Sequence, residues 1–126
     1  MATLTTRQEL SAQRDSAGTL WLVQSILGLL VIALLGLHMV AHHFIVEGGL
    51  RGFDQVIVYV QNPVIFVIEV AFLITVTVHA LLGVRSVIMD LGLSGGRQRL
   101  LNWTILIVGG LTLAYGLWLA VALQAL

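Results

Sequence analysis

One stretch decides the fold of this chain: residues 62–90, NPVIFVIEVAFLITVTVHALLGVRSVIMD. It opens with a proline, which fits the first turn of a helix, and continues as an apolar run longer than the roughly 20 residues that cross a bilayer. Residues 63–90 are therefore predicted to form a transmembrane helix. His79 lies 11 residues before Asp90, which places it ~16 Å inside the helix. An imidazole at that depth is costly without a partner, so His79 is the first candidate functional residue.

The composition extends this conclusion to the whole chain. Of 126 residues, 59% are hydrophobic and 10% are charged, against roughly 25% charged residues in soluble domains. Two further apolar segments are long enough to cross a membrane, and loops rich in glycine and charge separate the three. We expect an all-α membrane protein with one transmembrane domain over residues 1–126. Its parts are a polar lead-in at 1–18 and spans at about 20–46, 63–90 and 100–126.

The arginines predict the orientation of the chain. The lead-in, the second loop and the end of the span that leads into that loop together carry five arginines, and the first loop carries one. Positive charge favours the cytoplasmic side, so the N-terminus and the second loop are expected in the cytoplasm and the chain in the cytoplasmic (inner) cell membrane. No cleaved signal peptide is expected, because the first residues mix polar and charged groups. The five arginines are Arg7, Arg14, Arg85, Arg97 and Arg99, and the sixth is Arg51.

Several function classes are excluded or disfavoured. A net charge of zero leaves no basic surface for nucleic acid. The absence of cysteine excludes thiolate metal sites and iron–sulfur clusters held by this chain, so any cofactor must be bound through nitrogen or oxygen. Three helices make a poor channel or transporter, which favours packing against another membrane subunit. The small residues proposed for that contact are Gly28, Gly36, Gly109, Gly110 and Gly116.

The residues around His79 allow two interpretations. Positions three or four residues apart along its helix face are small or polar, namely Thr75, Gly83, Ser86 and Asp90. Such a face leaves room for a porphyrin, and a low-spin electron-transfer haem needs two axial ligands. Alternatively, Gly83 only allows close helix packing and His79 bonds to a backbone carbonyl. Zinc or a proton relay is less favoured, because no other ligand in the chain converges at this depth.

A second histidine level is predicted farther across the membrane. His38 lies 18 residues beyond Leu20, ~27 Å from the cytoplasmic face, so His38 and His79 cannot bind one iron. His38 and His42 share a helix face, and Glu69 is expected at about their depth. If both levels bind haem, the chain provides one ligand to each and a partner provides the others.

Alternatives remain open for the polar residues at this second level and near the helix ends. His42 and His43 could have a simple interfacial role. Glu69 could be a carboxylate behind a ligand, a proton-transfer group, or the partner of a polar group on a neighbouring helix. Arg85 could be a membrane-interface anchor or could contact a haem propionate.

Two motifs resemble one known family. His79-x-x-x-Gly83-Val84-Arg85, followed by Met89-Asp90-Leu91-Gly92, is similar to the haem-ligand helix of the cytochrome b membrane-anchor subunits of succinate:quinone oxidoreductases (succinate dehydrogenase and fumarate reductase, complex II). Gly52-Phe53-Asp54-Gln55 resembles the Gly-Phe-Glu-Gln that precedes the second helix in that family. The resemblance covers about 40 residues closely and the three-helix layout throughout.

The resemblance implies a function. His79 would be an axial ligand of the haem b nearer the cytoplasmic iron–sulfur subunit, with the second ligand from another transmembrane anchor. Members with two haems have a further histidine on the first helix, and His38, then His42, fits that position as an iron ligand. The implied partners are the second anchor, the iron–sulfur subunit and the flavoprotein subunit. The chain would pass electrons to a quinone, while succinate chemistry stays on the soluble subunits.

The chain departs from the family pattern at the quinone site. Ser25-Ile26-Leu27-Gly28 stands where many members have Arg-x-Ser-Gly, and Leu91 follows the aspartate where many sister anchors have a tyrosine. Gln24, Ser25 and Asp90 are the remaining quinone-contact candidates. The alternatives are a cytochrome b subunit of another membrane oxidoreductase, such as a hydrogenase, and a haem-free structural or transport subunit.

Overall fold

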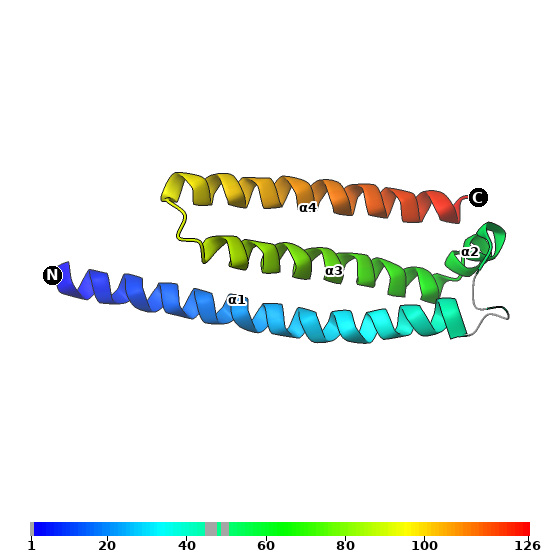
Figure 1. Cartoon of the computed structure of the whole chain (residues 1–126), viewed down its shortest axis with the longest axis horizontal. Coiled ribbons are helices and arrows are strands. Elements are labelled where there is room, and N and C mark those ends of the chain that lie inside the picture. The colour runs from blue at the N-terminus through cyan, green and yellow to red at the C-terminus, as the bar shows by residue number, and fades with distance from the viewer. Residues whose placement is uncertain (1, 45–47, 49–50) are drawn as a thin grey trace.

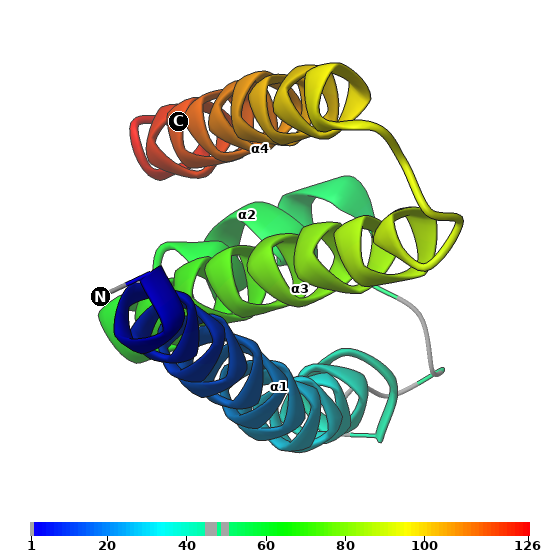
Figure 2. The ribbon, with the colours of Figure 1, turned by 90° about the vertical axis from the view of Figure 1, so that its left-hand side faces the viewer.

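The computed structural model describes the backbone of residues 2–44, 48 and 51–126, and within residues 2–16 it describes only the side chain of Gln8. Three long helices lie side by side, and α3 lies between α1 and α4 (Figures 1 and 2). Both outer helices pack on α3, and the described residues show no α1–α4 contact. The described part of the chain is all-α, as predicted. The elements are α1 (Ala2–Met39), the π-helical turn η1 (Val40–Phe44), α2 (Phe53–Val60), α3 (Pro63–Met89) and α4 (Gly95–Gln124).

In the part of the chain that the structure describes, three segments are long and apolar enough to cross a membrane, which confirms the number of predicted spans. They are Ala17–Phe44, Pro63–Met89 and Gly95–Gln124. The first predicted span ended at Val46, which lies outside the described residues. The third begins at Gly95, five residues before the predicted start at 100. The backbone of the lead-in is helical from Ala2 and continues into the first span without a break.

Hydrogen bonds between backbone N–H groups and nearby side chains explain where α2 and α3 begin. The Asn62 Oδ1 accepts hydrogen bonds from the backbone N–H of Val64 at 2.9 Å and of Ile65 at 3.4 Å, and Pro63 occupies the first turn of α3. The Gln55 Oε1 accepts a bond of 2.9 Å from the Gly52 N–H at the start of α2. The start of α3 agrees with the prediction from the sequence, whereas α2 was not predicted, because its residues were assigned to the loop and to the approach to the second span.

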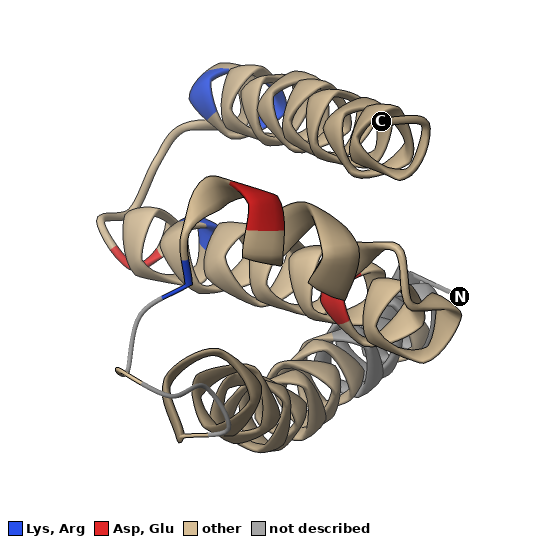
Figure 3. Cartoon of the chain, turned by 90° about the vertical axis from the view of Figure 1, so that its right-hand side faces the viewer, with Lys and Arg blue, Asp and Glu red and all other residues tan. Residues whose placement is uncertain are grey.

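The chain has almost no interior of its own. Among the residues whose burial is described, only Thr77 and Gly109 are buried, and large apolar side chains are exposed along all three spans. Charged positions are few, and long stretches of the helices carry none (Figure 3). Such surfaces are stable only against lipid or another membrane protein, because apolar area in water is unfavourable.

Three glycines that were predicted to face a partner instead serve packing within the chain. A Cβ placed on Gly109 would lie 2.6 Å from Leu81 Cδ1, and one placed on Gly116 would lie 2.6 Å from Leu73 Cδ2. A Cβ on Gly28 would lie 3.2 Å from the His79 ring. These three assignments were wrong, because the absent side chains make room for α3. Gly36 and Gly110 have no neighbour within 4 Å of that position.

Candidate functional site

The His79 ring packs against the backbone of α1. The Cβ position of Gly28 is nearest to His79 Cε1, at 3.2 Å, and lies 3.8 Å from Nδ1. The Nδ1 atom is buried and has no hydrogen-bond partner among the described residues. Among the described residues, no backbone carbonyl accepts a hydrogen bond from this ring nitrogen.

Gln24 connects α1 to the same turn of α3. Its Nε2 donates a hydrogen bond of 3.1 Å to the backbone carbonyl of His79 and lies 3.1 Å from the Cβ position of Gly83. The Gln24 side chain therefore occupies the space beside Gly83 where another residue would place its side chain. The Gln24 Oε1 is buried without a partner among the described residues. This polar pairing fixes the height of α1 relative to α3 at the His79 level.

An open groove of about 470 Å³ runs along α3 beside the ring. Its walls are mostly apolar and include His79, Ala80, Gly83 and Val84. A porphyrin needs an apolar surface next to a ligand nitrogen, so the groove and the unpartnered imidazole together fit a haem. The described residues provide no second histidine at this level.

A second cavity of about 230 Å³ lies between α1 and α3 nearer the loop that joins α3 to α4. Gln24, Arg85 and Asp90 line it, and so do Trp21 and Ser86. Two of the three predicted quinone-contact residues are thus at one cavity.

Two predicted residues near this cavity are engaged by their own chain. The Ser25 Oγ donates a bond of 2.9 Å to the Trp21 carbonyl on its own helix, and Ser25 is exposed. The Arg85 Nε donates a bond of 2.8 Å to Asn102 Oδ1, which connects α3 to α4. The contact predicted for Arg85 with a haem propionate stays a prediction.

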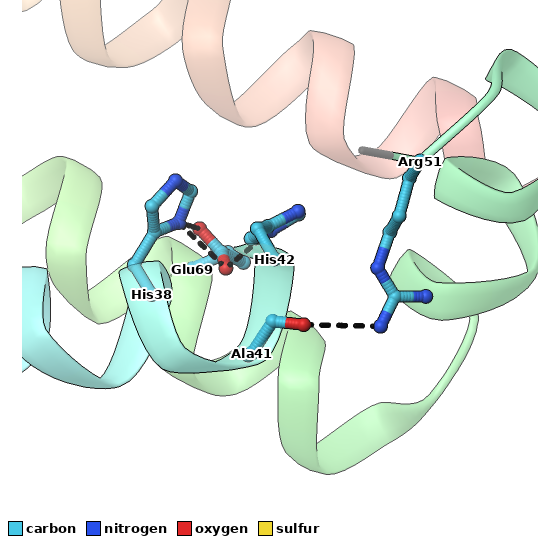
Figure 4. A network of polar contacts seen from close by, with 5 residues as sticks. All are labelled: His38, Ala41, His42, Arg51 and Glu69. Carbon is cyan, nitrogen blue, oxygen red and sulfur yellow. Dashed lines mark hydrogen bonds and ion pairs between the residues drawn. The ribbon is translucent and has the colours of Figure 1, made fainter. Parts of the chain in front are cut away.

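His38, His42 and Glu69 form one cluster, referred to below as the outer cluster (Figure 4). His38 Nδ1 lies 2.9 Å from Glu69 Oε2, and His42 Nε2 lies 3.3 Å from Glu69 Oε1. The predicted depth of Glu69 is therefore confirmed. Ten residues separate Gly28, opposite His79, from His38, so the two histidine levels lie ~15 Å apart. No single iron reaches both.

Arg51 and Tyr59 belong to the segment before α3, and their contacts place this segment next to the outer cluster. The Arg51 Nη2 donates a bond of 3.1 Å to the Ala41 carbonyl, and its guanidinium lies 4.0 Å above the Tyr59 ring. The Tyr59 ring meets His42 edge-on, with centroids 4.6 Å apart. Burial, together with the charge of Glu69, raises the pKa of Tyr59, and the charge of Arg51 opposes that rise. The contacts of Arg51 and Tyr59 with this region were not predicted from the sequence.

Next to the outer cluster, the backbone of the first span changes from an α-helix to a π-helix. Residues 40–44 form a π-helical turn that carries His42, and such turns are rare and frequent at functional sites. The carbonyl of Ala41, in the same turn, is the acceptor for Arg51. The local winding and the Arg51 bond together position His42 next to Glu69.

One family model matches nearly the whole chain. It describes the succinate dehydrogenase/fumarate reductase transmembrane subunit and covers residues 4–123. A search among curated proteins found no significant match.

Proposed function

Since the chain belongs to the family of succinate dehydrogenase/fumarate reductase transmembrane subunits, we propose that it anchors the soluble subunits of such a complex to the cytoplasmic membrane. In this role it crosses the membrane three times, with its N-terminus and second loop in the cytoplasm. A second anchor subunit covers part of its exposed apolar surface. The flavoprotein subunit carries out the succinate chemistry, and the iron–sulfur subunit exchanges electrons with this membrane part.

The observation that carries the cofactor proposal is the environment of His79. Its ring is held against Gly28, its Nδ1 has no described partner, and an apolar groove opens beside it. These residues fit one side of a haem b. Haem, when bound, supplies a one-electron carrier whose potential depends on its axial ligands and its burial. This chain provides one ligand, and the second anchor provides the other.

The chain's own residues orient that ligand. Gly28 fixes how closely the imidazole approaches α1, and the bond from Gln24 to the His79 carbonyl fixes the height of the two helices. Gly83 lines the groove, and Gln24 occupies the space where a side chain at residue 83 would lie. Arg85 lies about a turn and a half from His79, and we propose it for a haem propionate through the guanidinium nitrogens that do not bond to Asn102.

The cavity near the α3–α4 loop is the proposed quinone site. Gln24 and Asp90 line it, and Arg85 and Ser86 add polar groups. Ser25 is the weaker candidate, because its hydroxyl already bonds to the Trp21 carbonyl. Since Gln24 lines both this cavity and the groove beside His79, the two sites share a wall. Electron exchange between haem and quinone would thus cross a short distance.

The second haem expected from the sequence at the level of His38 and His42 stays a prediction.

Purification of the complex through a tag on this chain tests the proposed function. We expect a flavoprotein, an iron–sulfur protein and a second membrane anchor to co-purify, and b-type bands to appear in the reduced-minus-oxidised spectrum. A spectrum without these bands would contradict the haem assignment. Co-purification with a hydrogenase or a solute-binding protein in place of the flavoprotein would contradict the anchor assignment and favour one of the alternatives.

A further inference from the structure

A groove of about 290 Å³ lies between α3 and α4, and its walls are almost entirely apolar. We refer to it as the α3–α4 groove. Gly110 keeps it open, because a Cβ at this residue would meet nothing within 4 Å. The side chains that line the groove include Val78, Leu82, Ile105, Leu106 and Leu113.

Arg99 and Asn102 extend the lining face of α4 toward the α3–α4 loop. They precede Leu106 by seven and four residues, so the three residues share one face of the helix. Arg99 and Asn102 are both exposed. There is no acidic residue in α4, and the ion pairs among the described residues involve only Glu69 and two histidines. The positive charge at the start of α4 (Figure 3) therefore has no acidic partner in the described part of the chain.

The contact with Arg85 determines what Asn102 can offer to a ligand. The Asn102 Oδ1 accepts the hydrogen bond from Arg85 Nε at 2.8 Å. The amide N–H groups of Asn102 then remain as donors, about one helical turn from the guanidinium of Arg99. An amide and a guanidinium on one helix face suit the oxygens of a phosphate. Trp103 is 58% exposed at the same level, as expected of an aromatic residue at the membrane interface.

The length of the α3–α4 groove fits one leaflet of a bilayer. Ile105 and Leu113 are eight residues apart, which corresponds to ~12 Å along the helix. One leaflet supplies about half of the ~30 Å hydrocarbon core. Hydrogen-bond donors lie at the interface end of the groove, and apolar walls continue from there into the membrane. A phospholipid has its headgroup and its acyl chain in the same order.

The second anchor is expected on the opposite side of α3. Ala80 and Val84 line the groove beside His79, whereas Val78 and Leu82 line the α3–α4 groove. Each member of the second pair precedes one of the first by two residues, a rotation of ~200° about the helix. In the proposed complex, the subunit that provides the second haem ligand covers the first side. Lipid is then the neighbour of the second side.

We propose that the α3–α4 groove binds one anionic phospholipid, with its phosphate at Arg99 and Asn102 and one acyl chain along the apolar walls. Arg99 provides a charge-assisted hydrogen bond and attraction to negative charge. Arg85 and Arg97 add positive charge nearby, which disfavours the ammonium group of a zwitterionic headgroup. The site needs neither haem nor quinone, so it and the proposed function can fail separately.

A phosphatidylglycerol with a photoreactive diazirine in its acyl chain tests the proposal. The purified complex is placed in phosphatidylcholine nanodiscs with a small fraction of the probe and irradiated, and labelled peptides are mapped by mass spectrometry. We expect label within residues 105–113 and 78–82, about fivefold more than from the phosphatidylcholine analogue, the factor typical of one arginine at an anionic surface. Equal labelling by both probes, or no label on these segments, would overturn the proposal.

Two arginine variants separate a specific site from general attraction. Arg99→Gln should lower labelling by phosphatidylglycerol about fivefold. Arg97→Gln removes the same charge from a position two residues earlier, ~200° around α4, and should leave the labelling unchanged. Equal losses in the two variants would show that the arginines only attract anionic lipid to the surface, and would overturn the proposed site.

Filling the groove tests the place of the acyl chain. Gly110→Leu should abolish labelling of residues 105–113, because its side chain enters the open space of the groove. Ala114→Leu adds a similar volume at an exposed position outside the lining and should not. Assembly and the b-type spectrum are recorded for each variant. A lost spectrum with normal labelling would contradict only the haem proposal.

Other occupants of the α3–α4 groove predict different results. If a helix of the second anchor fills it, residues 105–113 stay unlabelled in the assembled complex. If the tail of a quinone fills it, excess quinone removes the label and Arg99→Gln has no effect. Either result would overturn the lipid proposal.

Discussion

The imidazole of His79 lies against the backbone of Gly28, so closely that a Cβ at residue 28 would be 3.2 Å from His79 Cε1. This contact joins α1 to α3 at the level of the proposed haem. It also explains why a glycine stands at that position, since any side chain would push the ring toward the groove or away from it. The orientation of the proposed ligand is therefore set by a residue on a different span.

Gly28→Val tests this relationship. The added carbons would displace the ring at a cost of about 1–3 kcal/mol, which corresponds to a roughly 5- to 150-fold loss of haem affinity. Haem content by pyridine haemochrome and the low-spin EPR signal of the complex measure it. The matched control is Gly36→Val on the same helix, where a Cβ meets nothing within 4 Å. Equal haem content in the two variants would contradict the positioning role of Gly28.

Gln24 and Gly83 should act as a pair. A Cβ on Gly83 would lie 3.1 Å from Gln24 Nε2, the atom that donates to the His79 carbonyl. Gly83→Ala should therefore destabilise the wild-type chain, and should do so much less in a Gln24→Ala background. Chemical unfolding of the four variants of this cycle should give a coupling of about 0.5–3 kcal/mol. Additive effects would show that the two residues do not interact.

Gly116 should matter more than Gly110 for the α3–α4 contact. A Cβ on Gly116 would meet three atoms of Leu73, at 2.6, 3.1 and 3.4 Å, so that rotation of a single methyl group does not relieve the clash. Gly116→Ala should cost about 1–3 kcal/mol. Gly110→Ala, with open space around it, should be neutral or gain about 0.5–1 kcal/mol from helix propensity. Unfolding in a denaturing detergent compares the two, and a reversed order would contradict the packing described here.

Tyr59 should make the chain sensitive to alkaline pH. Burial and the charge of Glu69 raise the pKa of Tyr59, with Arg51 opposing. The unfolded chain then loses this proton at a lower pH than the folded chain does. The stabilisation is therefore complete below the ordinary pKa of about 10 and is lost as pH rises through the higher folded value. Unfolding measured against pH should show a smaller alkaline loss in Tyr59→Phe than in wild type. An identical loss would exclude Tyr59 as its source.

The sequence was sufficient for features that depend on local chemistry and length. Asn62 and Pro63 predicted the start of α3, and the apolar segments predicted the three spans. Counting residues along the helices predicted that Glu69 lies at the depth of His38, and their 2.9 Å contact confirms it. These inferences need only helix geometry, which does not depend on which faces meet.

Contacts between helices were beyond the sequence. Apolar residues surround each span, so their pattern does not indicate which face packs on a neighbour. For that reason Gly28, Gly109 and Gly116 were assigned to a partner although they face α3. The bond from Gln24 to the His79 carbonyl has the same origin, since it joins two residues far apart in the chain.

The assignment of His79 as a haem ligand is tested most directly by measuring the haem content of the purified complex after His79 is replaced. The complex is purified from wild type, His79→Ala and the control His43→Ala, and haem per flavin is measured by pyridine haemochrome. If His79 is a haem ligand, the His79→Ala chain should still co-purify with its partner subunits but lack the haem that both wild type and His43→Ala contain. A His79→Ala complex with its full haem content would contradict it.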